Sequence, residues 1–381
     1  MKLRIPLQIQ YWLTIFVTGV LWLVGFTFGS GWGLAHDVYG KAELITIAVF
    51  VIFLFKQGQL RHVPREFVLL LLYLAFCFAY YKSCFDSSLF SYFWLFLLLP
   101  LMEELNLERD QMTIISLLFL LGSLVILCTA TYTSILRGWD GNGISIPAFF
   151  SYTVFAVSFG EVRNWKKILF FSLITVFYFS MLYALNSRSS ILFSLVLILC
   201  VFNVIPMRRW IRKRALILVL LAPLALAVLV VWLRNATWLE SANQWSLEHF
   251  HKPLYSGRET IWYNGFQTWL QHPLLGNGSF AVRWHNNALT LLVGTGVVGY
   301  CLYISFIYYL LRRAGKYSQD SIINGLIMAY LMIWLQQSLE IGLISTKGNA
   351  IPFVILGLML ARAKTLERND EQQTIGHYPD L

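Results

Sequence analysis

Residues 256–299 read SGRETIWYNGFQTWLQHPLLGNGSFAVRWHNNALTLLVGTGVVG, an amphipathic and charged island in a chain that is otherwise mostly hydrocarbon. The island contains two arginines, Arg258 and Arg283, and two histidines, His272 and His285, before it returns to apolar sequence. Long apolar runs lie on both sides of it. The sequence therefore places this island at the surface of a membrane, on a scaffold of helices that cross it.

The composition predicts an all-α, polytopic membrane protein. Of 381 residues, 58% are hydrophobic and only 13% are charged, whereas a soluble domain carries about 25% charged residues. Apolar runs near 20 residues recur along the whole chain, and the alternating pattern of a transmembrane β-barrel does not. The net charge of +10 is spread over the loops, so nucleic acid is not indicated as a partner. The five cysteines form no CxxC, so neither a metal site nor a disulfide framework is indicated.

We expect about twelve membrane spans, several of them short enough to be broken or tilted helices. Their approximate bounds are 11–29, 43–55, 67–81, 88–101, 112–131, 147–160, 168–185, 189–205, 215–233, 288–311, 322–338 and 350–362. This divides the chain into spans one to nine in 1–233, an outer loop with an amphipathic helix in 234–287, spans ten to twelve in 288–363, and a tail in 364–381. The tail is polar and is expected to be disordered. The inner loop 103–111 is acidic and is expected to be a solvated turn.

The basic residues predict the orientation of these spans. With both chain ends inside, 20 of the 29 lysines and arginines fall on the inner side. The nine on the outer side are Lys41, Lys82, Arg137, Arg188, Arg234, Lys252, Arg258, Arg283 and Lys347. These nine are candidates for function, because the positive-inside rule disfavours them.

The outer loop 234–287 is long for a connection, and long loops are usually functional or disordered. Its Ser256-x-x-Glu259 spacing is typical of a helix capping box, and the helix is expected to end near Gln271, before Pro273. Arg258 would then lie in the first turn, where the helix dipole favours an anion. Two interpretations of Arg258 remain open: it binds an anion together with the helix N–H groups, or it pairs with Glu259 or solvent.

Three further side chains are candidate site residues. Arg188 lies between two apolar runs with little polar sequence around it, which favours a function at membrane depth over snorkelling to the headgroups. Lys82 follows the third span at the outer boundary, where snorkelling is the simpler interpretation. His285 lies at the mouth of the tenth span and is a candidate base, although a lone histidine is more often structural and others in the loop compete for the role. The GTGVVG run is interpreted as a close-packing helix patch.

Four short motifs follow one another in this part of the chain: Asn186-Ser-Arg188, Ser256-Gly-Arg258-Glu with Trp262, the run His272-Pro-Leu-Leu-Gly276-Asn-Gly278, and His285-Asn-x-x-Leu289 followed by Gly294 and Gly299. In these residues and their order the sequence is similar to the O-antigen ligase/polymerase superfamily, and most like the ligases. The resemblance covers about 185–300 well and the twelve-span plan more loosely.

The resemblance implies a GT-C-like membrane glycosyltransferase in a bacterial inner membrane, with both termini cytoplasmic and the active site facing the periplasm. Its donor would be a polysaccharide on undecaprenyl pyrophosphate and its acceptor a sugar hydroxyl of lipid A–core. Arg188 and Arg258 would bind the pyrophosphate, Lys82 would add a cation by position, and His285 would be the base. The family reaction is inverting and needs no metal or other cofactor, which agrees with the few carboxylates on the outer side of this chain. The role of Arg283 stays open.

Two alternatives remain at this point. A polysaccharide polymerase shares the same motifs, but polymerases often carry two sizeable outer loops and this chain has one. A flippase for lipid-linked sugars would line a central path with cations deep in several spans, whereas here the cations gather near the outer edge.

Overall fold

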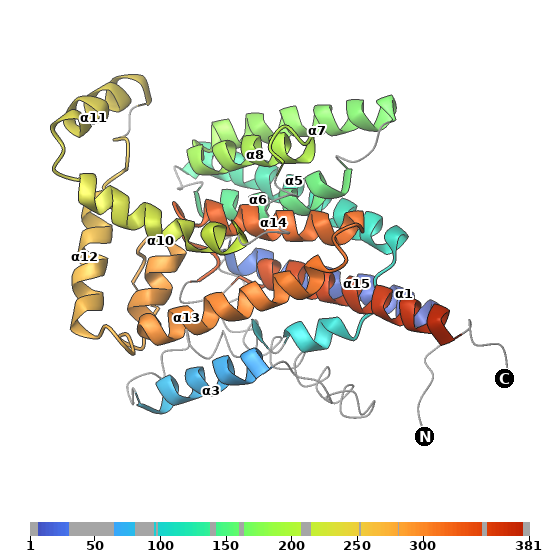
Figure 1. The fold of residues 1–381 in the computed structure, drawn as a ribbon. Helices are drawn as coiled ribbons and strands as arrows, with labels where there is room; N and C mark the ends of the chain where they lie inside the picture. Colours follow the sequence, from blue (N-terminus) through green and yellow to red (C-terminus); the bar gives the residue numbers. More distant parts are fainter. Residues whose placement is uncertain are drawn as a thin grey trace.

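The computed structural model describes residues 7–29, 65–80, 95–96, 98–137, 142–159, 164–206, 215–250, 253–280, 282–344 and 349–375. The regular elements in these ranges are helices, which confirms the all-α prediction (Figure 1). They are α1 (Leu7–Gly29), α3 (Arg65–Tyr80), α5 (Arg109–Arg137), α6 (Asn142–Phe159), α7 (Trp165–Ala184), α8 (Arg188–Val201), α10 (Ala215–Leu233), α11 (Thr237–Phe250), α12 (Arg258–Gln271), α13 (Asn287–Gly315), α14 (Ser321–Gln336) and α15 (Ala350–Ile375).

Four of these helices contain a segment long and apolar enough to cross a membrane: 109–129 in α5, and α7, α10 and α13. Several other helices are apolar but shorter, among them α8 and α14. Large apolar side chains stand exposed on the outside of α7 and α10, such as Val176 and Trp232, as expected of helices that face lipid. These features support a multi-pass membrane protein. The expected span 43–55 lies outside the described residues, and 88–101 is described only in part.

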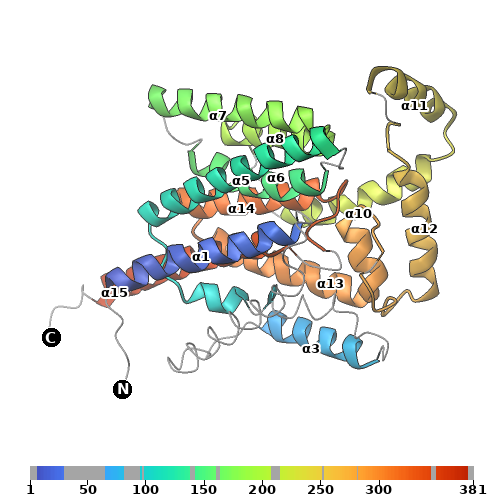
Figure 2. The ribbon, with the colours of Figure 1, turned by 180° about the vertical axis from the view of Figure 1, so that it is seen from behind.

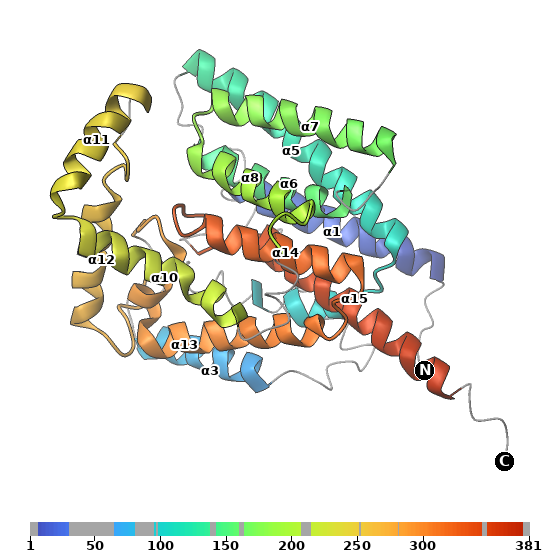
Figure 3. The ribbon, with the colours of Figure 1, turned by 45° about the horizontal axis from the view of Figure 1, so that its top comes forward.

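The helices form a bundle with an overhanging arm. Helices α14 and α15 lie at its centre, with α6 and α1 packed against them. Most of α14 is buried, including Trp334 and Tyr330. Helices α11 and α12 lie together at the end of the bundle that is opposite to the last residues of α15 (Figures 1 and 2). Seen with its top tilted forward, α10 leads from the bundle into this arm (Figure 3).

Acidic and basic side chains gather at the end of the bundle away from the arm. Arg362 is paired with Asp320 at 2.8 Å, and Arg313 with Glu103 at 2.6 Å. Glu104 contacts Lys364 and Arg368. These basic residues are among those that the sequence placed on the inner side, and the structure brings them together at one end of the bundle.

Two expectations about this end are wrong. The segment 103–111 is not a freely solvated turn, because Glu103 and Gln111 are buried and α5 begins within it at Arg109. The polar tail is not disordered throughout, because α15 continues to Ile375. Its polar part is held by ion pairs and by a hydrogen bond from Arg368 to Asn106 at 2.9 Å. A tail that looks unstructured by composition is thus ordered by charges far away in the sequence.

Helix α13 is broken at Gly296, and the segment 273–278 completes its hydrogen bonds. Gly296 has φ 65° and ψ −173°, a conformation that is essentially restricted to glycine. The carbonyls of Val293 and Gly294 accept from Asn277 and Gly278, while Val297 and Val298 donate to Pro273 and Leu274. In a helix that contacts lipid every backbone group needs such a partner, so the loop allows the break.

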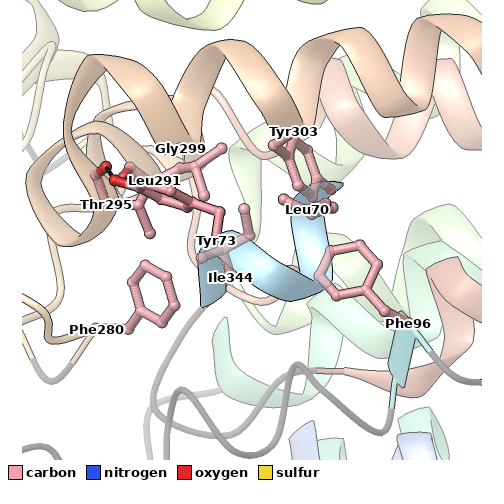
Figure 4. Close-up of a pocket in the computed structure, with 9 residues that line it drawn as sticks. All are labelled: Leu70, Tyr73, Phe96, Phe280, Leu291, Thr295, Gly299, Tyr303 and Ile344. Carbon is pink, nitrogen blue, oxygen red and sulfur yellow. Dashed lines mark hydrogen bonds between the residues drawn. The ribbon is translucent and has the colours of Figure 1, made fainter. Parts of the chain in front are cut away.

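The break also contacts α3. Tyr73 donates from its hydroxyl to the carbonyl of Thr295 at 2.5 Å (Figure 4). The residues around this bond line a small, almost entirely apolar cavity: Leu70, Tyr73, Phe96, Phe280, Leu291, Thr295, Gly299, Tyr303 and Ile344. A Cβ on Gly294 would lie 2.4 Å from the ring of Phe280. The GTGVVG run is therefore close-packed as expected, but against a loop and α3.

Candidate active site

Strained backbone marks the candidate residues. In the described part of the chain, non-glycine residues with positive φ are Asn186, Asn203, Ser256 and His285. One of these is His285 itself, and two others lie two positions before Arg188 and Arg258. A left-handed conformation is unfavourable for residues with a side chain, and it persists where the surrounding structure requires it, often at functional sites.

Arg188 and the start of α12 are joined by a hydrogen bond. Arg188 Nη2 donates to Ser256 Oγ at 3.0 Å and lies 3.5 Å from the carbonyl of Pro253. The capping box expected at Ser256 is therefore wrong in detail: Gly257, with φ 78°, occupies the N-cap position without a side-chain cap. The hydroxyl of Ser256 accepts the hydrogen bond from Arg188 and does not cap α12. The predicted end of α12 at Gln271 is confirmed.

Arg258 pairs with a carboxylate that is distant in the sequence. Its Nη2 lies 3.2 Å from Oε1 of Glu340, and the two side chains are only 18% and 10% exposed. The same Oε1 accepts from Ser189 Oγ at 2.7 Å. In the described part of the chain Arg258 forms its ion pair with Glu340 and not with Glu259, the partner considered from sequence. Two elements, α8 and the segment after α14, thus meet the first turn of α12 here.

Arg188 and Arg258 lie close enough to repel each other, and Glu340 attracts both. Two guanidinium groups beside one carboxylate leave an excess of positive charge. Bidentate binding of a phosphate is a characteristic use of arginine. The arrangement can accept an anion with more than one negative charge.

His285 lies at the entrance to α13, beside α12. The residue before it, Trp284, accepts a hydrogen bond at its carbonyl from the indole of the fully buried Trp262, at 2.7 Å. The residue after it, Asn286, caps α13 and donates to the carbonyl of Ser338 at 3.0 Å. His285 is therefore held between the helix that carries Arg258 and the segment that carries Glu340. Its side chain is partly exposed.

A comparison with protein-family models identifies this region. Residues 173–304 match the model of the O-antigen ligase family. The match spans about a third of the chain and contains Arg188, Arg258 and His285, so the resemblance inferred from motifs is confirmed there. A search of curated proteins found no match.

Within the O-antigen ligase region, the break in α13 gives a structural reason for two of the quoted motifs. The run from His272 to Gly278 and the glycines from Gly294 onward hydrogen-bond to each other. A Cβ on Gly276 would lie 2.5 Å from the backbone of residues 294–296. The glycines of these two motifs therefore allow the backbones to approach closely beside the site.

Other predicted residues stand apart from this candidate site or cannot be placed. Lys82 lies outside the described residues. Arg283 is exposed, two residues before His285. His249 stacks on Trp245 in α11, and His272 is exposed at the end of α12. Among the described ranges, no group of three or more His, Cys, Asp or Glu side chains is arranged to hold a metal ion.

Sequence reasoning missed two features around the O-antigen ligase region. Glu340 was not singled out from the few carboxylates on the outer side. Its position directly after a span was a signal, but its partners lie 82 and 151 residues away. Helix α11 was also missed, although Thr237-x-x-Glu240 has the spacing of a capping box.

Proposed function

We propose that this protein is an O-antigen ligase, a GT-C-like glycosyltransferase of a bacterial inner membrane. It transfers a polysaccharide from undecaprenyl pyrophosphate to a sugar hydroxyl of lipid A–core. The observation that carries the proposal is that Arg188 and Arg258 meet at one end of the bundle, inside the region that matches the O-antigen ligases. The residues on either side of His285 are bonded to the helix that carries Arg258 and to the segment that carries Glu340. In this scheme that end faces the periplasm, both termini are cytoplasmic, and the lipids of the bilayer surround the bundle.

The proposed site binds the donor through its pyrophosphate. Arg188 and Arg258 approach from α8 and α12, and each can form two parallel N–H···O bonds with a phosphate. Lys82 would add a third cation at the outer end of the third span. In a site partly shielded from water these fixed charges stabilise the negative charge that develops on the leaving group. The arginines therefore take the part that a metal ion has in many other glycosyl transfers.

His285 is the proposed base. The acceptor hydroxyl loses its proton to the imidazole as its oxygen attacks the anomeric carbon of the donor. The bond from that carbon to the pyrophosphate oxygen breaks, and its electron pair leaves with undecaprenyl pyrophosphate. The attack comes from the opposite face, so the anomeric configuration inverts. A positioned base contributes about 10²–10⁴-fold to such a step.

The lipopolysaccharide profile of a deletion strain tests the proposal. We expect loss of all polymer-bearing lipopolysaccharide, accumulation of lipid-linked polymer, and recovery when the gene is returned. Retention of a single repeat on the core would instead indicate a polymerase. With purified protein, release of undecaprenyl pyrophosphate separates glycosyl transfer from transport, because a flippase forms no such product.

The proposed chemistry also predicts that transfer does not depend on a divalent metal ion. Transfer by purified protein should continue in an excess of a divalent-metal chelator. Loss of transfer in chelator, with recovery on adding a divalent ion, would contradict neutralisation by arginines alone.

A further inference from the structure

Glu340 accepts a hydrogen bond from Arg258 that would otherwise be available to an anion. It follows α14 by a few residues and is buried. Its backbone is fixed nearby, since the carbonyl of Ser338 accepts from Asn286. Its Oε1 accepts from Ser189 and Arg258 together. A carboxylate held in this way is not a mobile surface group.

The guanidinium of Arg258 has N–H groups that Glu340 does not use. Nη2 is bound to Glu340, and Nη1 makes only a long contact of 3.4 Å with the carbonyl of Tyr255. Nε is buried and has no hydrogen-bond partner within the described residues. Since a buried polar group without a partner is unfavourable, Arg258 gains hydrogen bonds when a multidentate anion arrives.

The charges at the site change during the proposed reaction. The donor is a pyrophosphate esterified at both ends, so it carries about two negative charges. When the glycosidic bond breaks, the product has a free terminal phosphate and gains up to one more, because a terminal phosphate has a second pKa near 6. The two positive charges of Arg188 and Arg258 balance the two negative charges of the lipid-linked donor. A fixed carboxylate beside them therefore disfavours the product more than the donor.

We propose that Glu340 is an internal counterion of Arg258. The two side chains pair in the resting protein, and Arg258 turns from Glu340 to the pyrophosphate when the lipid-linked donor binds. The pair forms again when the product leaves. Glu340 touches Arg258 and not the substrate, so it is a positioning residue. Ser189 holds the carboxylate in place while Arg258 is engaged elsewhere. The inference rests on the proposed function, because it assigns the pyrophosphate to Arg258.

Glu340→Gln tests the role of the charge, because glutamine keeps an oxygen for Ser189 and Arg258. Farnesyl pyrophosphate is a soluble probe of the site. We expect the variant to bind it at least about tenfold more tightly, since one like charge is removed a few Å away at an effective dielectric near 20. Transfer should show a lower KM together with a lower kcat, because product release slows. Glu340→Asp, which retains the charge, should restore kcat toward the wild-type value.

Glu259→Gln is the matched control. It removes a negative charge from the residue next to Arg258, yet Arg258 pairs with Glu340. Probe binding should change less than about threefold in this control, as expected when a charge is not in direct contact. Equal effects of the two glutamine variants would overturn the counterion proposal. So would a Glu340→Gln variant that loses kcat with KM and probe affinity unchanged.

Two further outcomes keep the inference testable. If Glu340→Gln does not fold, Ser189→Ala gives a second route: it leaves the charge but removes its competing hydrogen bond, so Arg258 is held more strongly and the probe binds more weakly. Tighter or unchanged binding in that variant would contradict the proposal. If wild-type protein shows no binding of the probe that depends on Arg258, the proposed function itself fails, and the counterion role fails with it.

Discussion

Arg188 donates a hydrogen bond to Ser256 across 68 positions of sequence, at 3.0 Å, and so ties the start of α8 to the turn before α12. Ser256 has a φ of 51°, and its hydroxyl points to the arginine where the sequence predicted a helix cap. The bond places a residue from the apolar bundle beside the amphipathic arm. The pairing of Arg258 with Glu340 then brings the second arginine to the same place.

Arg258→Lys tests the anion site, because lysine keeps the charge and loses the planar fork. We expect transfer to fall by about tenfold or more, the effect of losing one charge-assisted hydrogen bond, with normal protein levels. Arg283→Lys is the matched control, since Arg283 is exposed. Transfer by that variant should stay close to wild type. A fully active Arg258→Lys protein would reduce Arg258 to a structural residue.

His285→Ala tests the base and should lower transfer at least about a hundredfold while leaving binding of the lipid-linked donor intact. His285 has a φ of 51°, so alanine also adds backbone strain. Asparagine tolerates this conformation but cannot act as a base near neutral pH. His285→Asn should therefore fold normally and still lose transfer.

His249→Ala is the control for the histidine prediction. His249 lies on α11, stacked on Trp245, and its loss should change transfer by a few-fold at most. The base assignment is wrong if His285→Asn transfers normally, or if it fails only because the donor no longer binds.

Local signals predicted the helices well, because the length of an apolar run and a proline after a helix act within one element. The expected spans 11–29, 67–81 and 215–233 coincide closely with α1, α3 and α10. Pro273 correctly predicted the end of α12 at Gln271. The start of α12 was misjudged, because Ser256 bonds to a residue in another helix and not to the local backbone.

The candidate site was only partly predictable, because some of its contacts join residues that are far apart in the sequence. Arg188 and Arg258 stand out because the positive-inside rule disfavours basic residues on the outer side, and His285 stands out because it lies at the mouth of a span. Glu340 could not be assigned to Arg258, since nothing in the sequence relates a residue after α14 to one at the start of α12. Likewise the sequence of α13 is a continuous apolar run with glycines and does not reveal the break. Only the fold shows that residues 273–278 complete its hydrogen bonds.

Gly296→Ala tests the break in α13. A Cβ at this position would lie 2.2 Å from the carbonyl oxygen of Leu274, and φ is +65°. We expect a loss of about 2–3 kcal/mol in the free energy of unfolding, seen as a lower melting temperature in detergent. Gly315→Ala is the control, because its Cβ meets nothing within 4 Å. That change should be neutral or slightly stabilising, since alanine favours a helix by up to about 1 kcal/mol. Equal melting temperatures would show that α13 can close into a continuous helix.

Cysteine labelling tests which end of the bundle faces outward. Ser241 is exposed on α11 in the arm, and Gln319 is exposed between α13 and α14 at the opposite end. The excess of basic residues at the second end predicts that it is cytoplasmic. In a background without native cysteines, Ser241→Cys should react with a membrane-impermeant thiol reagent in intact spheroplasts. Gln319→Cys should react only after lysis. Native Cys128 and Cys301 are exposed and must be replaced first. The reverse pattern would place Arg188, Arg258 and His285 in the cytoplasm, away from a donor presented in the periplasm, and would contradict the proposed function together with the orientation.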